Sequence, residues 1–133
     1  MGNLLKGRFN VYIVACSKRP ELLFGETNLW LEPNLMYGVY QINDNDVFIC
    51  TEKVARNMSF QGYSQVPQQV TLLYECLGEE IIGFPVRSTC SFYPFVYILP
   101  LDYHKTVRAT NIVCIDIIPG YWCVCKCSQY RTI

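Results

Sequence analysis

Hydrophobic and polar residues alternate with a period of two along most of this chain, and that period predicts β-strands. The predicted strands cover residues 8–16, 35–42, 46–52, 69–76, 79–86, 92–99, 110–117 and 121–129. Polar turn segments separate several of them, at 43–46, 77–80, 100–105 and 119–120. Pro94 lies inside one run, where proline indicates an edge strand, a bulge or a break into two shorter strands.

The first run, RFNVYIVAC, is apolar on both of its faces. Phe9, Val11 and Ile13 share one face, and Tyr12 and Val14 share the other. A strand of this kind is typical of a sheet that is buried on two sides or covered by a partner.

Helical periodicity is short. Residues 51–58 predict two turns of helix with Thr51 as the cap, and residues 20–24 predict a single turn. A length of 133 residues predicts one domain, spanning 1–133. About eight short strands with at most one or two short helical turns predict an all-β fold, either a β-sandwich or a jelly-roll-like barrel.

Composition narrows the possible partners. Eleven basic and eleven acidic residues cancel, which argues against a nucleic-acid binder that works through its overall field. Hydrophobic residues make up 51% of the chain and tyrosines number ten, which favours a surface covered by other proteins. The apolar run at 11–16 is too short for a signal peptide or a membrane span. We therefore expect an intracellular protein that is not secreted and binds neither membrane nor nucleic acid.

The eight cysteines include Cys123, Cys125 and Cys127 at alternate positions. Along an extended strand such side chains lie about 7 Å apart, whereas a disulfide needs Cβ atoms about 4 Å apart. The chain has no C-x2-C pair, and His104 is its one histidine. These cysteines therefore predict a strand face, with reduced thiols and no metal, while a thiolate cluster or redox chemistry remain the alternatives.

Catalytic residues cannot be assigned from the pattern. A Cys–His nucleophile could use His104, but nothing selects one of the cysteines. Asp102 and His104 share one side of an extended segment, yet residues 100–105 are typical of a solvated loop. We expect a protein without catalytic, cofactor-binding or metal-binding residues.

Residues 111–122, NIVCIDIIPGYW, resemble the V-I-D-x-D-Y-x-G stretch of trimeric dUTPases. Ile115, Asp116 and Tyr121 are the matching types, and Asp116 takes the place of the family's essential aspartate. Ile118 and Pro119 stand where the second acid and the tyrosine would be. The resemblance implies a β-barrel ancestry without the activity, as in the inactive dUTPase relatives of adenoviruses.

In general character the chain also resembles small accessory and capsid-associated proteins of DNA viruses. The leading hypothesis is a non-enzymatic structural protein, a viral minor capsid or capsid-cementing component of the host nucleus and virion. It would form a homo-oligomer, with a trimer preferred, and would contact other proteins of the assembly. The alternatives are an intracellular viral accessory protein that binds a host protein and a nucleotide hydrolase of dUTPase type.

Overall fold

The structure, a computed structural model, describes residues 8–17, 24, 26–88, 91–101 and 121–127, with the backbone alone for 15–17 and 121–127. Its strands are β1 Asn10–Ser17, β2 Asn28–Leu31, β3 Met36–Gln41, β4 Asp46–Cys50, β5 Thr71–Leu77, β6 Pro85–Arg87, β7 Val96–Pro100 and β8 Tyr121–Cys127. The helix α2 spans Glu52–Phe60, and the short 3-10 helix η2 spans Gly78–Glu80. The prediction of an all-β fold with little helix is confirmed.

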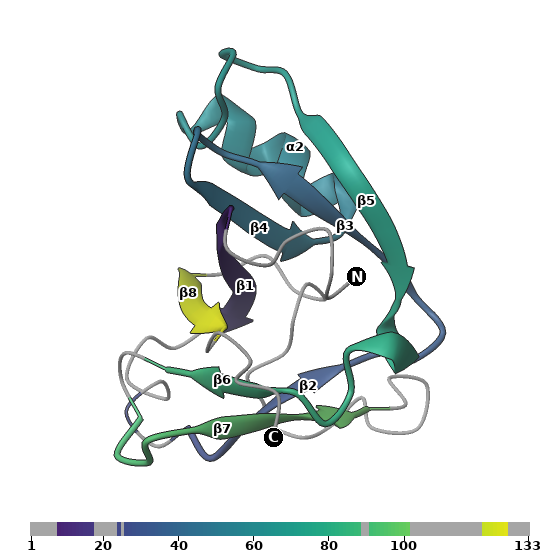
Figure 1. The fold of residues 1–133 in the computed structure, drawn as a ribbon, viewed down its shortest axis with the longest axis vertical. Helices are drawn as coiled ribbons and strands as arrows, with labels where there is room; N and C mark the ends of the chain where they lie inside the picture. Colours follow the sequence, from purple (N-terminus) through teal and green to yellow (C-terminus); the bar gives the residue numbers. More distant parts are fainter. Residues whose placement is uncertain (1–7, 18–23, 25, 89–90, 102–120, 128–133) are drawn as a thin grey trace.

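The described strands form one mixed sheet in the order β2-β7-β6-β8-β1-β4-β3-β5. The pairs β1–β4 and β2–β7 are parallel, and the other neighbours are antiparallel. The sheet is bent, so that β2, β6 and β7 lie on one side of the molecule and β3, β4 and β5 on the other, joined through β1 and β8 (Figure 1). The described strands therefore form one bent sheet, which corrects the prediction of a β-sandwich or a jelly-roll-like barrel. Parallel pairs need long crossover connections, which strand periodicity does not reveal.

An inner core fills the space inside the bend. It takes alternate side chains from seven strands, β1 to β7, so each strand contributes the face that points inward. Its members are Ile13, Leu29, Leu31, Tyr37, Val39, Val47, Ile49, Cys76, Ile81, Val86, Val96 and Ile98. Burial of these apolar side chains is the main force that holds the sheet in its bent shape.

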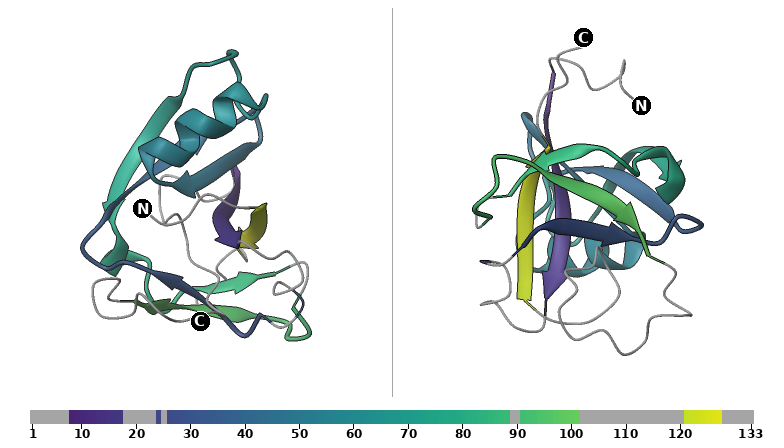
Figure 2. Two further views of the ribbon diagram at one scale, coloured as in Figure 1. Left: turned by 180° about the vertical axis from the view of Figure 1, so that it is seen from behind. Right: turned by 90° about the horizontal axis from the view of Figure 1, so that it is seen from below.

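The opposite, outer face of β1, β3 and β4 is covered by α2, which lies in front of β3 and β4 in the back view of Figure 2. Val54, Ala55 and Met58 of the helix pack there. In β1, Ile13 belongs to the inner core and Val14 to the layer under the helix. The predictions of a two-sided first strand and of an inward helical face are both confirmed.

A glycine makes close packing under the helix possible. The ring of Tyr40 lies over Gly38, two residues earlier on the same face of β3, and a Cβ atom on Gly38 would come within 2.5 Å of that ring. Tyr40 is itself buried in the layer beneath α2, so its ring has little room to move away. Any larger residue at position 38 would disturb that layer.

Some predicted strands differ from the observed ones. Residues 79–86 form η2, a turn with Gly83 at a φ of 82°, and only then the short strand β6. The run at 92–99 is a strand only from Val96 onward, and that strand lies between β2 and β6. The expected edge strand or pair of short strands at Pro94 is therefore wrong, because Pro94 lies in the bend before the strand. The strand β2 was not predicted, because only two apolar positions alternate in its four residues. The predicted strand at 110–117 and residues 20–23 of the predicted helical turn lie outside the described residues.

Candidate functional site

A buried carboxyl group lies where the chain enters β2. Glu26 is only 4% exposed, and the hydroxyl of Ser88 donates a hydrogen bond to its side chain. The Ser91 hydroxyl donates to the backbone carbonyl of Glu26 at 2.7 Å. Glu26 therefore connects the start of β2 to the segment that leads from β6 to β7.

Burial raises the pKa of the Glu26 carboxyl above its usual range, because removal from water disfavours the charged form, and the hydrogen bond from Ser88 opposes this effect. A carboxyl with a raised pKa is often a catalytic acid or base, but such a group must also reach its substrate. Glu26 is too buried for that contact. Its geometry is that of a structural link between two strands.

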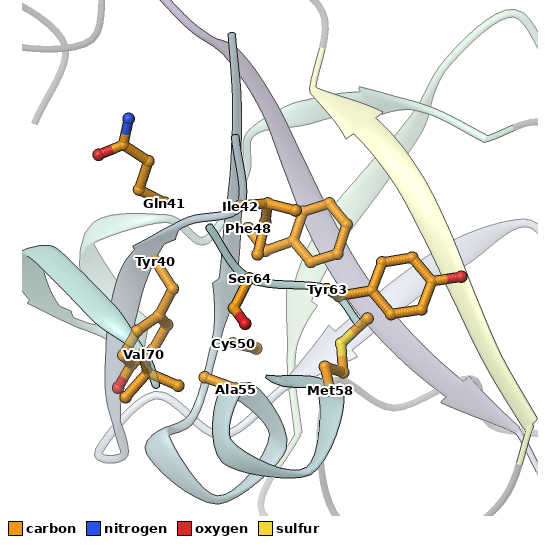
Figure 3. A pocket seen from close by; sticks show the side chains of 10 residues that line it. All are labelled: Tyr40, Gln41, Ile42, Phe48, Cys50, Ala55, Met58, Tyr63, Ser64 and Val70. Atoms are coloured by element: carbon orange, nitrogen blue, oxygen red, sulfur yellow. The ribbon is translucent and has the colours of Figure 1, made fainter. Parts of the chain in front are cut away.

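A shallow hollow lies beside α2, lined by residues of β3, β4, α2 and the segment after the helix (Figure 3). Tyr63 and Met58 lie along one side of it, and the rings of Phe48 and Tyr63 are 6.2 Å apart. Its interior has room for at most about one water molecule. A site of this size holds no organic ligand.

A third feature is an exposed group of aromatic side chains on the outer side of β2, β6 and β7. We call this group the aromatic face: the exposed Phe95 and Tyr97, the half-buried Trp30 and the exposed cation Arg87. Tyr97 is 52% exposed and Phe95 is 41% exposed, and no described element covers them. Two more exposed aromatic residues, Phe92 and Tyr93, lie in the bend before β7. A contiguous apolar surface on a protein usually marks a binding site.

In the described part of the chain, no group of three His, Cys, Asp or Glu side chains is arranged so that it could hold a metal ion. Cys50 and Cys76 are buried among apolar side chains, in the role that small apolar residues fill. Burial and the nearby Glu80 carboxylate raise the pKa of Cys76 to about 11, so its thiol stays uncharged at neutral pH. Among the described residues no helix has the length and apolar character of a membrane span.

Several residues singled out in the sequence are not placed. Asp102, His104, Ile115, Asp116, Ile118 and Pro119 lie outside the described residues. The backbone of Cys123, Cys125 and Cys127 is in β8, so the predicted strand forms, while their side chains lie outside the description. Their reduced state and the absence of a metal stay predictions.

Comparison with known proteins identifies relatives among enzymes and not among viral proteins. No family model matches the chain. Over 109 residues the chain is 40% identical to the cytoplasmic leucine–tRNA ligase of Pongo abelii, a match that covers 82% of this chain and 9% of the ligase. This chain is similar to part of a leucine–tRNA ligase.

Solved structures extend the likeness to leucine–tRNA ligases. The crystal structure of GlLeuRS-CP1 is 34% identical, with a TM-score of 0.68, and the match covers 80% of this chain and 39% of that one. The editing domain of the P. falciparum cytosolic leucyl-tRNA synthetase shares the fold, with a TM-score of 0.66, 21% identity and coverage of 80% and 42%. The chain therefore spans about a tenth of the ligase and about two fifths of each solved chain.

The likeness to leucine–tRNA ligases overturns the main functional predictions. The expected viral capsid or accessory protein, and the dUTPase-like ancestry, rested on about a dozen residues and on composition. An identity of 40% over 109 residues outweighs both. The prediction of a non-enzymatic protein is wrong for the same reason, since the relatives are ligases.

The predicted partners and location are corrected as well. We expected a homo-oligomer in a capsid without nucleic acid, but the relatives are tRNA ligases. Net charge alone does not exclude nucleic-acid binding, because charges can be distributed unevenly over a surface. The predicted host nucleus and virion are wrong, because the relatives are named as cytoplasmic enzymes.

Proposed function

We propose that this chain forms part of the editing domain of a leucyl-tRNA synthetase and acts on wrongly aminoacylated tRNA. The observation that carries the proposal is the 40% identity to a leucine–tRNA ligase over 109 of 133 residues. The matches to GlLeuRS-CP1 and to a solved editing domain support the assignment to this part of the enzyme.

Editing answers a physical problem. A hydrophobic pocket discriminates between aliphatic amino acids that differ by one methylene group by only about 10- to 200-fold. A synthetase reaches higher accuracy with a second site that hydrolyses the wrong product. In that reaction water adds to the ester carbonyl, the bond to the tRNA ribose breaks, and the ribose oxygen takes up a proton. Free amino acid and free tRNA are the products.

The described residues serve this function as a scaffold. Glu26 is closed to a substrate, and the hollow beside α2 is too small for an amino acid. Both features favour a second candidate function, in which the chain binds tRNA without hydrolysing the ester itself. One assay distinguishes the two.

The assay measures deacylation of tRNA that accepts leucine, charged with isoleucine or valine, in the presence of the full 133-residue chain. We expect faster release of the wrong amino acid than in buffer alone, with leucine-charged tRNA released at the buffer rate. Retention of the same tRNA on a nitrocellulose filter reports binding. Binding without release would favour the second candidate, and neither binding nor release would contradict both.

A further inference from the structure

The outer side of β2, β6 and β7 presents aromatic rings because inward and outward positions alternate along each strand. Val96 and Ile98 of β7 are fully buried, whereas Tyr97 of β7 and Phe95, which directly precedes the strand, are exposed. The register places Asn28 of β2 and Pro85 of β6 on either side of Tyr97. Tyr97 is therefore at the centre of the aromatic face.

The aromatic face also carries a positive charge. The guanidinium group of Arg87 lies over the ring of Phe95, 5.8 Å from its centre. Among the outward residues that the structure describes on β2, β6 and β7, Arg87 is the charged one, and none is acidic. A surface with exposed rings, one guanidinium group and no carboxylate is complementary to an anion that carries flat apolar groups.

We propose that the aromatic face binds unpaired bases of RNA, with the rings of Phe95 and Tyr97 stacking on bases and Arg87 contacting a phosphate. This inference rests on the proposed function, which supplies tRNA as the partner. The single-stranded end of a tRNA has unpaired bases of this kind. The proposal adds a binding surface that shares no residue with the hollow beside α2.

The geometry fits base stacking. Sheet faces bind single-stranded RNA when their exposed aromatic rings stack two or three bases. Side chains two residues apart along an extended chain are separated by about 7 Å, so Phe95, just before β7, and Tyr97, within it, can each accept a different base. Phe92 and Tyr93 are also exposed, in the bend before β7. Stacking tolerates any base, which suits a surface that holds a strand without reading its sequence.

The first experiment measures fluorescence anisotropy of a labelled single-stranded RNA of about ten nucleotides with the full chain. A labelled RNA duplex of the same length serves as the comparison probe. We expect the single strand to bind more tightly than the duplex. Phe95→Leu removes a ring but keeps apolar bulk, and it should weaken single-strand binding by roughly 5- to 150-fold.

Matched variants separate stacking from general damage. Phe60→Leu changes the same residue type at an exposed position of α2, outside the aromatic face, and should bind like the unchanged chain. Tyr97→Phe keeps its ring and should also bind normally, whereas Tyr97→Ala should not. Arg87→Ala should lower the slope of log K against log salt by about one, and Arg87→Lys should keep that slope.

Two results would overturn the inference. One is single-strand binding that is no tighter than duplex binding, and the other is equal binding by the Phe95→Leu and Phe60→Leu chains. If either result occurs while the unchanged chain still binds and deacylates charged tRNA, the inference about the aromatic face fails and the proposed function stands. If instead the unchanged chain binds the single strand as expected but does not deacylate charged tRNA, the proposed hydrolysis fails while the inference about the aromatic face stands.

Discussion

The bent sheet has two outer faces, and they differ in what covers them. On β1, β3 and β4 the outward apolar side chains are buried under α2. On β2, β6 and β7 the outward rings of Phe95 and Tyr97 are exposed, and no described element covers them. Both faces arise from the same alternation along the strands. The difference is local, because β4 ends at Cys50 and the chain passes directly into a helix that packs back on its own sheet.

Comparison of the two faces shows how a strand that is apolar on both sides can be interpreted. Such a strand belongs to a buried layer when a helix with an apolar side follows at once, as α2 follows β4. Where the described chain offers no covering element, as at β7, the same pattern indicates a surface that binds another molecule.

Of the two outer faces, the covered one should show the larger effect on stability. Met58→Ala shortens a side chain of α2 that packs against the sheet, and it should lower the free energy of unfolding by about 2–5 kcal/mol. Phe60→Ala, at a position on the same helix that is 64% exposed, should change it by about 0.5 kcal/mol or less. Urea unfolding of both variants measures the difference. Equal effects would mean that α2 does not pack on the sheet as described.

A pH-dependent effect is expected at the link between β2 and the segment before β7. Burial raises the pKa of Glu26 above its ordinary value of 4.5. Below pH 4.5 the carboxyl is protonated in both states, so its contribution to stability is fully present there. That contribution is lost as the pH rises through the folded pKa, because the folded state then holds a buried charge.

Glu26→Gln replaces the protonated carboxyl with a neutral group of similar shape. The melting temperature of the variant should therefore exceed that of the unchanged chain at pH 8, and the gap should shrink toward pH 4.5. Glu52→Gln, at an exposed position of α2, is the matched control and should show no such trend. A gap that grows on acidification would contradict the sign of the pKa shift.

The sequence allowed correct prediction of elements whose cause is local. The two-sided burial of Ile13 and Val14 and the inward side of α2 both follow from residues close together in the chain. The strand β2 and the parallel pairing of β1 with β4 depend on partners far away in sequence, so periodicity could not reveal them. A buried acid such as Glu26 looks like any surface acid until the fold places Ser88 beside it.

The aromatic face could be predicted only in part from the sequence. The letters FYPFVY at 92–97 hold four aromatic residues, which signals an interface. They do not show that Phe95 lies next to Arg87, because that contact comes from the pairing of β6 with β7. Net charge also did not reveal the contact, because it does not report where single charges such as that of Arg87 lie on the surface.

The smallest effect on stability is expected on the aromatic face. Tyr97→Ala removes a ring that packs against no described layer, and it should change the free energy of unfolding by about 0.5 kcal/mol or less. Tyr37→Ala removes the same side chain from the inner core and should cost about 3–5 kcal/mol. Urea unfolding of the two variants compares one residue type on an open and a buried surface. If Tyr97→Ala costs as much as Tyr37→Ala, other parts of the chain cover the ring, and the face is closed to RNA.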